Sequence, residues 1–266
     1  MPTFIFRISV LVLLTLPVAP RCALGDEPIG PITKPIKLFN GRDLSGFHTY
    51  LKDTEHQDPD RVYSVVDGAI RISGQGAGYL ATAQAYRDYH LTLEFRWGKK
   101  TDGSAFVRNS GVLVHQVNPD RIWPSSIEIQ LAQGCEGDLI VIPGKDSGGA
   151  TGRATITSNT RIAADKKSRW SPDGVPTKHS GQQFWWSKHQ PGFEEKLDTR
   201  GRDDLASPLG EWTRVECLAR GSRLTIRING TTVNEAYDVE PAAGRILLQN
   251  EGSEVFFRDV RLEPLP

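Results

Sequence analysis

The sequence predicts an all-β sandwich that fills most of the chain. Apolar and polar residues alternate along residues 91–97 and 126–131, which is typical of strands with one buried face. Asp67-Gly68 and Asn229-Gly230 each separate two strand-like segments. These dipeptides favour the tight turn of a β-hairpin, because both central residues of that turn need a positive φ. Since no segment reads as a long amphipathic helix, many short strands with turn residues between them indicate a sandwich or barrel.

The expected strands are short and follow one another along the chain. They cover residues 61–66, 69–73, 91–97, 111–115, 126–131, 223–228, 231–233, 245–249 and 255–262. Residues 142–208 differ, because they are rich in Gly, Ser, Thr, Lys and Asp and their strand patterns are weak. A segment of that length without clear elements is usually functional or mobile. Two interpretations stay open: a surface insertion, or a set of loops around a binding site.

The N-terminus has the pattern of a cleavable signal peptide, expected to cover residues 1–25. Arg7 precedes a short apolar run, Pro17 ends that run, and the small residues Ala23 and Gly25 follow. The run is too short for a stable membrane span. We therefore expect export of a bacterial protein to the periplasm or the medium. A proline-rich linker over residues 26–36 and a single domain over residues 37–266 should follow.

Charge and cysteine content exclude some classes of protein. Lys and Arg together number 32, as do Asp and Glu, so the formal net charge is zero. A nucleic-acid-binding protein would show a basic excess or stripe, so we do not expect nucleic acid as a partner. Beyond the signal peptide only Cys135 and Cys217 remain. They could form one disulfide or lie reduced in the core, and the sequence leaves both this and the oligomeric state open.

Glu128 is the first candidate for chemistry. In a strand, residues two apart point to the same face, so Glu128 and Gln130 should lie together on the face opposite the core. They could bind a polyhydroxylated ligand or transfer a proton, or they could be an ordinary solvated surface. Sandwich glucanases carry three carboxylates along one such strand, whereas here Gln130 and Gln133 stand in place of two of them. Ordinary glycoside hydrolysis needs two carboxyl groups, which this strand alone does not supply.

Several other residues could belong to a site. His115 at the end of one strand could be a general base, a metal ligand or a structural histidine. Arg108 could polarise a carbonyl oxygen. Trp123 and Trp185 could stack on sugar rings or anchor loops in the core. His48 and His56 fall in a hydrophilic segment that is expected to be a solvated loop.

Several motifs together resemble one family, the 3-keto-disaccharide hydrolase domain, also described as a 3-keto-glucoside 1,2-lyase/3-keto-2-hydroxyglucal hydratase domain. They include LFNGRDLSG at 38–46, NSGVLVH at 109–115 and WPSSIEIQ at 123–130. The others are residues 208–212, 244–252 and 256–259. The motifs span nearly all of residues 37–266 in order. The resemblance implies a concanavalin A-like jelly-roll fold and a saccharide substrate.

The chemistry that the resemblance implies needs one good base and a partner for an oxyanion. A ketone at C3 of the sugar acidifies the hydrogen at C2, and removal of that hydrogen gives an enolate. The group at C1 then leaves by β-elimination, and water adds to the resulting enone, so the net reaction is hydrolysis. We expect Glu128 or His115 as the base and Arg108 or a lysine as the partner of the enolate oxygen.

The remaining expected residues would bind the substrate. Asn109 and Gln130 would hold hydroxyl groups, and Gln249 and Glu251 would reach the same cavity from a neighbouring strand. A divalent cation held by His115 and Glu128 is an alternative to the basic side chain, and the sequence does not decide between them. The alternative function is a non-catalytic, lectin-like carbohydrate-binding module, because a fold does not fix a function.

Overall fold

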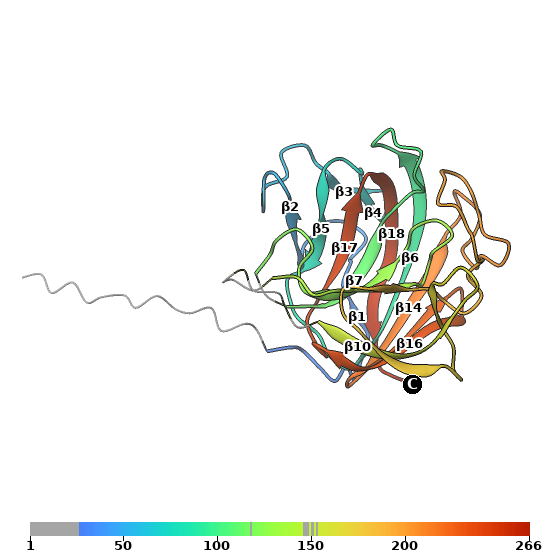
Figure 1. The fold of residues 1–266 in the computed structure, drawn as a ribbon. Helices are drawn as coiled ribbons and strands as arrows, with labels where there is room; N and C mark the ends of the chain where they lie inside the picture. The colour runs from blue at the N-terminus through green and yellow to red at the C-terminus, as the bar shows by residue number, and fades with distance from the viewer. Residues whose placement is uncertain (1–26, 118, 146–148, 150–151, 153) are drawn as a thin grey trace, which may run out of the picture.

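The computed structural model describes residues 27–117, 119–145, 149, 152 and 154–266. The expected signal peptide lies outside these residues. The described chain folds into two sheets in which every paired strand is antiparallel, and it contains no helix (Figure 1). The prediction of an all-β, concanavalin A-like jelly-roll sandwich is confirmed. No helix capable of crossing a membrane occurs among the described residues.

The larger sheet has eleven strands. Its main path runs β11-β10-β16-β15-β14-β6-β18-β4-β3, with β1 paired to β18 and β12 paired to β10. In chain order its strands are β1 (Ile36–Lys37), β3 (Tyr63–Val66), β4 (Ala69–Ile72), β6 (Tyr89–Lys100), β10 (Thr155–Ile162), β11 (Ser168–Trp170), β12 (Val175–His179), β14 (Thr213–Arg220), β15 (Arg223–Ile228), β16 (Thr231–Glu240) and β18 (Ser253–Glu263).

The smaller sheet has seven strands in the order β13-β9-β8-β7-β17-β5-β2 and carries the candidate site. In chain order they are β2 (Phe47–Leu51), β5 (Ala77–Thr82), β7 (Gly111–Gln116), β8 (Ser126–Gln130), β9 (Leu139–Ile142), β13 (Gln183–Phe184) and β17 (Arg245–Glu251). Strands β7 and β8 follow each other in the chain, whereas their neighbour β17 comes from its C-terminal part, so the sheet brings residues near 110, 130 and 250 together.

One hydrophobic core lies between the sheets. The inward side chains of β6, among them Leu91, Leu93 and Phe95, pack there and are at most 1% exposed. From the smaller sheet, Ile127 and Ile129 enter the same core. Since side chains alternate along a strand, Glu128 and Gln130 take the opposite face, as the sequence predicts.

Both predicted hairpin turns have the required backbone. Asp67 and Gly68 have φ values of 49° and 75° between β3 and β4. Asn229 and Gly230 have φ values of 46° and 80° between β15 and β16. A positive φ at both positions matches the right-handed twist of the flanking strands.

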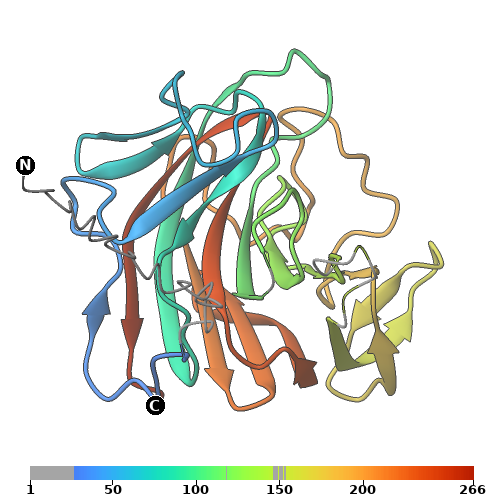
Figure 2. The same cartoon turned by 90° about the vertical axis from the view of Figure 1, so that its left-hand side faces the viewer.

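Residues 142–208 contain more regular structure than their sequence indicates. Strands β10, β11 and β12 extend the larger sheet at one edge, where they stand out in yellow in Figure 2. Strand β13 instead pairs with β9 of the smaller sheet. The segment is therefore both a sheet extension and, as shown below, a wall of the candidate site. Strands β1, β2, β5, β9 and β14 also escape the sequence analysis; β5 is buried along nearly its whole length, so it shows no alternation.

The two cysteines are separate buried thiols. Cys217 lies in β14 within the main core, whereas Cys135 lies in the turn between β8 and β9 and packs against Val107 and Ala132. The structure thus favours the second of the two arrangements that the sequence leaves open.

Candidate active-site cleft

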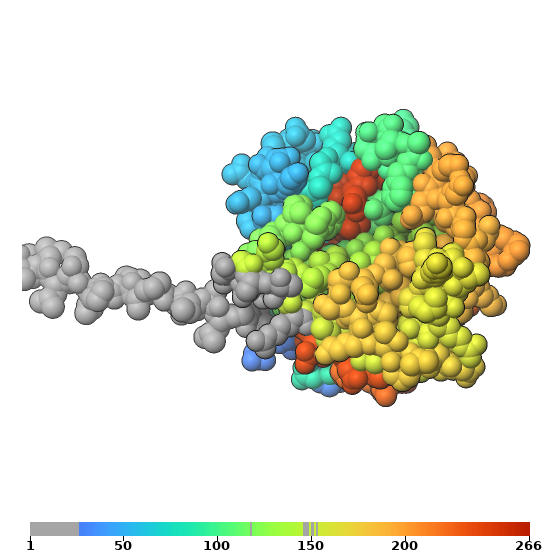
Figure 3. Space-filling model, viewed as in Figure 1, coloured from blue at the N-terminus to red at the C-terminus, as the bar shows by residue number. Residues whose placement is uncertain are grey.

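An open cleft of about 500 Å³ lies on the outer face of the smaller sheet, within the usual volume range of small-molecule sites. Figure 3 shows a hollow on the front of the molecule, where red atoms of the C-terminal strands are visible between cyan and green segments. The cleft is lined by Asn109, Trp123, Glu128, Gln130, Ile140, Val141, Ile142, Pro143, Gly181, Gln182, Gln183, Gln249 and Glu251.

Glu128 of β8 lies at the floor of this cleft with only 4% of its surface exposed. Its carboxyl group lies over Gly111 of β7, and a Cβ atom at that position would be 2.3 Å from Oε1. A side chain at position 111 would therefore displace the carboxyl group from this position. Burial, followed by the nearby charge of Glu251, raises the pKa of Glu128 to about 8, although a hydrogen bond from Gln249 opposes this.

A second carboxyl group, that of Glu251, enters the cleft from the end of β17. Its Oε2 accepts a hydrogen bond from Asn109 Nδ2 at 2.8 Å, and the two residues also form a backbone bridge. Burial raises the pKa of Glu251, and the charge of Lys100 counteracts part of that effect. The cleft thus contains two carboxyl groups, which come from different strands. The sequence pattern of β8 alone predicted only one of them, that of Glu128.

Neutral amides surround these carboxyl groups. Oε1 of Gln249 and Oδ1 of Asn109 are buried and have no hydrogen-bond partner among the described residues. Buried polar atoms are normally paired, so these oxygens are positioned to accept hydrogen bonds from a ligand. Gln130 Oε1 accepts the backbone N–H groups of Leu131 and Ala132, which leaves its NH₂ group to donate. The set suits a ligand with many hydroxyl groups.

Trp123 lies at one side of the cleft, in the segment that leads into β8. Its φ of 54° is unusual for a bulky side chain, and such strained positions cluster at binding and active sites. Gln182 and Gln183, at the start of β13, also line the cleft. Residues 142–208 therefore do supply part of the rim.

His115 is not at the cleft, so the expectation that it is a base or metal ligand there is wrong. Its side chain is fully buried, its Nδ1 lies 3.0 Å from the carbonyl oxygen of Pro241, and its ring packs edge-on against Tyr89. Strict alternation would place residues 111, 113 and 115 on one face. A bulge between β7 and β17, with a φ of 58° at His115, turns this side chain to the core.

This placement has two consequences for the expected chemistry. Burial lowers the pKa of His115 to about 4, which keeps the imidazole neutral at physiological pH. His115 and Glu128 point to opposite faces of the sheet and do not meet, so the cation that they were expected to share has no site between them.

Arg108 and Trp185 also lie away from the cleft. The Arg108 guanidinium donates to the Gly98 carbonyl oxygen at 2.8 Å and pairs with Asp198, so it holds two loops together. The ring of Trp185 is covered by the cations of Lys167, 4.4 Å from its centroid, and Arg169, at 5.5 Å. Neither residue is placed to touch a ligand beside Glu128. Among the described residues that line the cleft, none is Lys or Arg.

Another polar cluster lies on the smaller sheet at the β2 edge, and sequence analysis missed it. Asp120 Oδ2 lies 3.0 Å from His48 Nε2, and its Oδ1 accepts the Tyr79 hydroxyl at 2.9 Å. Burial opposes ionisation of Asp120, but the hydrogen bonds from His48 and Tyr79 outweigh it and lower its pKa. His48 lies in β2, not in the expected solvated loop. Its alternation with Tyr50 was the pattern that could have revealed the strand.

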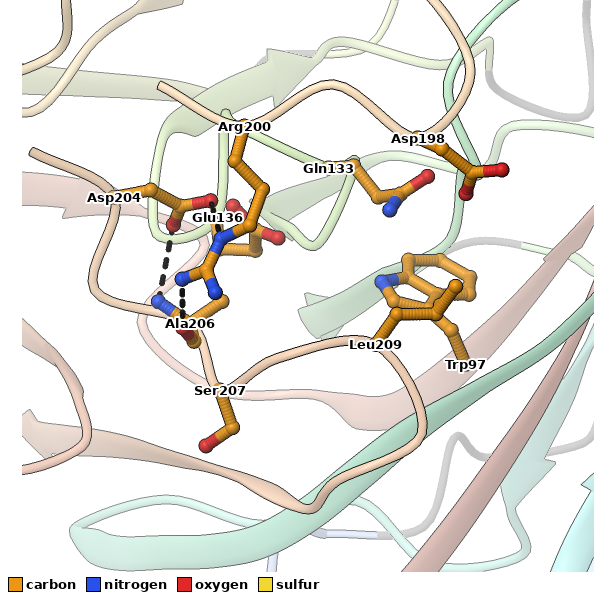
Figure 4. A pocket seen from close by; sticks show the side chains of 9 residues that line it. All are labelled: Trp97, Gln133, Glu136, Asp198, Arg200, Asp204, Ala206, Ser207 and Leu209. Carbon is orange, nitrogen blue, oxygen red and sulfur yellow. Dashed lines mark hydrogen bonds and ion pairs between the residues drawn. The ribbon is translucent and has the colours of Figure 1, made fainter. Parts of the chain in front are cut away.

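A second cavity, of about 100 Å³, lies beside the Arg108 contacts (Figure 4). Glu136 is buried there, and burial together with the adjacent Asp204 raises its pKa well above the usual range. Arg200 donates to Asp204 Oδ2 at 3.3 Å. At a fifth of the volume of the cleft, this cavity is too small for a typical ligand site.

Comparison with known proteins identifies the family. The model of the 3-keto-alpha-glucoside-1,2-lyase-like domain matches residues 34–263. The chain belongs to this family. The expected resemblance is thus confirmed, and a carbohydrate-active role follows from it. No curated protein matched the chain.

Solved structures with the same fold include two proposed glycosyl hydrolases from Parabacteroides distasonis. One has a TM-score of 0.53 and 17% identity, covering 88% of this chain and 94% of that chain. The other has a TM-score of 0.48 and 19% identity, covering 87% and 100%. A carbohydrate-binding module from Bacillus subtilis has a TM-score of 0.46 and 10% identity, covering 82% and 95%. At these identities the likeness concerns the fold alone.

Proposed function

We propose that the protein cleaves 3-keto-glycosides in this cleft by β-elimination followed by hydration. The observation that carries the proposal is the buried Glu128 carboxyl group, whose pKa of about 8 is close to physiological pH. A general base works best when its pKa lies near the working pH. Membership of the 3-keto-alpha-glucoside-1,2-lyase-like family supports the same chemistry.

In the first step the Glu128 carboxylate removes the proton from C2 of the keto sugar. The electron pair of that C–H bond moves toward C3, and the ketone oxygen becomes an enolate. Since the cleft lining holds no basic side chain, amide N–H groups such as those of Gln130 stabilise this oxygen. A row of neutral donors is sufficient for this role when the site excludes water.

In the second step the enolate expels the oxygen at C1, which takes up a proton and leaves as an alcohol. Glu251, which lines the same cleft, is placed to supply that proton from its protonated form. Water then adds to C1 of the enone and gives up one proton to Glu251, and C2 regains a proton from the Glu128 carboxyl group. The sum of both steps consumes one water molecule and cleaves one glycosidic bond.

The second candidate function is that of a conventional glycosidase. Glu251 supports it, because such enzymes use two carboxyl groups on either side of the bond that is cleaved. A lectin-like module is the third, because it would use the same amides without a reaction. The three are separated by one experiment with a chromogenic 3-keto-glucoside and its parent glucoside.

Release of the aglycone from the keto sugar alone supports elimination. Turnover of the parent glucoside supports the glycosidase, and binding without turnover supports the module. Glu128→Gln keeps the shape of the side chain and removes the base, so it should abolish turnover. Near-normal activity of this variant would exclude Glu128 as the base.

We also propose that the protein works outside the cytoplasm. The pattern of Arg7, the apolar run and Pro17 supports export, and a saccharide-cleaving protein would meet its substrates there. N-terminal sequencing of the protein from a bacterial periplasm or medium should find a chain that begins near Asp26. An intact N-terminus on protein from the cytoplasm alone would contradict export.

A further inference from the structure

A cluster of metal-ligand side chains lies outside the cleft and has no part in the proposed reaction. We propose that Cys135, Asp138 and His189 bind one zinc ion. All three are buried, with 1%, 0% and 4% of their surfaces exposed. One ligand atom from each lies within 4.8 Å of the others.

The separation of the two nearest ligand atoms fits tetrahedral zinc. Zinc binds thiolate at about 2.3 Å and imidazole at about 2.0 Å, so tetrahedral angles place sulfur and nitrogen ~3.5 Å apart. Cys135 Sγ and His189 Nε2 lie 3.4 Å apart. An ion can therefore contact both atoms without a rearrangement of this pair.

The His189 ring is held in the tautomer that a metal requires. Its Nδ1 lies 3.2 Å from the Gln190 carbonyl oxygen, to which it donates its proton, so the Nε2 lone pair faces Cys135. Metal-binding histidines commonly donate their second nitrogen to a carbonyl in this way. Edge-on contacts with Trp185 and Phe193 fix the ring plane.

The other ligands are also supported. Asp138 Oδ1 accepts the backbone N–H of Trp186 at 3.0 Å, and Oδ2 accepts Gln183 Nε2 at 3.1 Å. Glu195 Oε1 lies 3.6 Å from Cys135 Sγ on the exposed side of the cluster. Glu195 or a water molecule can therefore complete four ligands.

The chemistry of this set selects zinc among common divalent ions. A thiolate with an imidazole suits zinc, whereas calcium and magnesium prefer oxygen ligands. The carboxyl groups of Asp138 and Glu195 and the Nε2 lone pair of His189 lie near the Cys135 thiol. That thiol has only one proton to donate to them. A dication offsets this excess of acceptors, and its binding releases the thiol proton.

The position suggests a structural role for the ion. Cys135 and Asp138 belong to the turn after β8, while His189 and Glu195 follow β13 in the long segment 142–208. Zinc would join these two parts of the chain. Because Asp138 also holds Gln183, which lines the cleft, the ion would stabilise one wall of the candidate active site.

The test begins with the unaltered mature protein. After treatment with a chelator and dialysis, it should bind one equivalent of Zn²⁺ in a competition titration, and its melting temperature should rise with added Zn²⁺. Co²⁺ in place of Zn²⁺ should give the visible bands of a tetrahedral site and a thiolate charge-transfer band. These measurements need no variant and do not depend on activity.

Variants then assign the ligands. Cys135→Ser and His189→Gln should each weaken Zn²⁺ binding by at least ~100-fold, since loss of outer contacts alone weakens metal sites 10- to 100-fold. Cys217→Ser, at the other buried thiol, is the matched control and should bind Zn²⁺ as the unaltered protein does. Failure of the unaltered protein to bind Zn²⁺, or unchanged binding by folded Cys135→Ser, would overturn the proposal.

Discussion

Replacing Glu128 by Gln should make the protein more stable at neutral pH while it removes activity. Burial gives the folded state a Glu128 pKa of about 8, against an ordinary value of 4.5. The folded state therefore binds a proton that the unfolded state releases between these pH values. Stability contributed by this raised pKa is complete below pH 4.5 and is lost as the pH rises toward 8.

The size of the effect follows from the pH interval. For each pH unit between the ordinary pKa of 4.5 and pH 7, the raised pKa of Glu128 lowers the free energy of unfolding by about 1.4 kcal/mol. At pH 7 the free energy of unfolding is therefore lower by about 3 kcal/mol. Gln has nearly the same shape and cannot ionise. We expect Glu128→Gln to gain most of this free energy at pH 7, a rise in melting temperature of roughly 6–12 °C for a chain of this size. At pH 4 the two proteins should be nearly equal.

Chemical denaturation at several pH values measures the difference directly. Glu211→Gln is the control, because Glu211 is exposed and its replacement should change stability little at any pH. A Glu128→Gln protein that is less stable than the unaltered protein at pH 7, or a difference that does not vary with pH, would refute the assignment of a raised pKa to this carboxyl group.

Three further predictions concern the cleft. The value of kcat/KM for a 3-keto-glucoside should rise as the pH approaches about 8, where Glu128 ionises, and a rate that is flat from pH 6 to 9 would exclude Glu128 as the base. Gly111→Ala should lower kcat about 100-fold, because its Cβ would displace the Glu128 carboxyl group, and normal kcat would contradict that contact. Trp123→Ala should raise KM about tenfold if its ring stacks on the sugar, whereas Trp185→Phe should leave KM unchanged; the reverse result would place the sugar elsewhere.

Strand periodicity predicted the central part of the site because it is a local property. Alternation in β8 fixes the face of Glu128 and Gln130 without knowledge of any other strand. The meeting of Asn109 with Glu251 is different, since it depends on β7 lying beside β17. The family resemblance led to the prediction that both residues reach one cavity, but not to the hydrogen bond between them.

The incorrect placements arose where one residue or a distant loop changes the local pattern. A single inserted residue in β7 reverses the direction of His115, and such a bulge is not visible in an alternating sequence. The Arg108 side chain pairs with Asp198, which lies 90 residues later in the sequence, and so it does not reach the cleft. Trp185 is covered by Lys167 and Arg169 for the same reason, because cation–π partners cannot be read from the tryptophan itself.

The electrostatics of the two cleft carboxyl groups distinguish the proposed elimination from glycoside hydrolysis. A glycosidase generally separates its two pKa values, so that one carboxyl group is ionised as a nucleophile or base while the other stays protonated. Here burial raises the pKa of both Glu128 and Glu251, although the charge of Lys100 opposes part of the rise at Glu251. Burial thus disfavours the ionised carboxylate that hydrolysis of an unoxidised glucoside needs as its nucleophile or base. Removal of the C2 proton also needs an ionised base, but the ketone makes that hydrogen acidic, so the fraction of Glu128 that is ionised near its pKa of about 8 is sufficient.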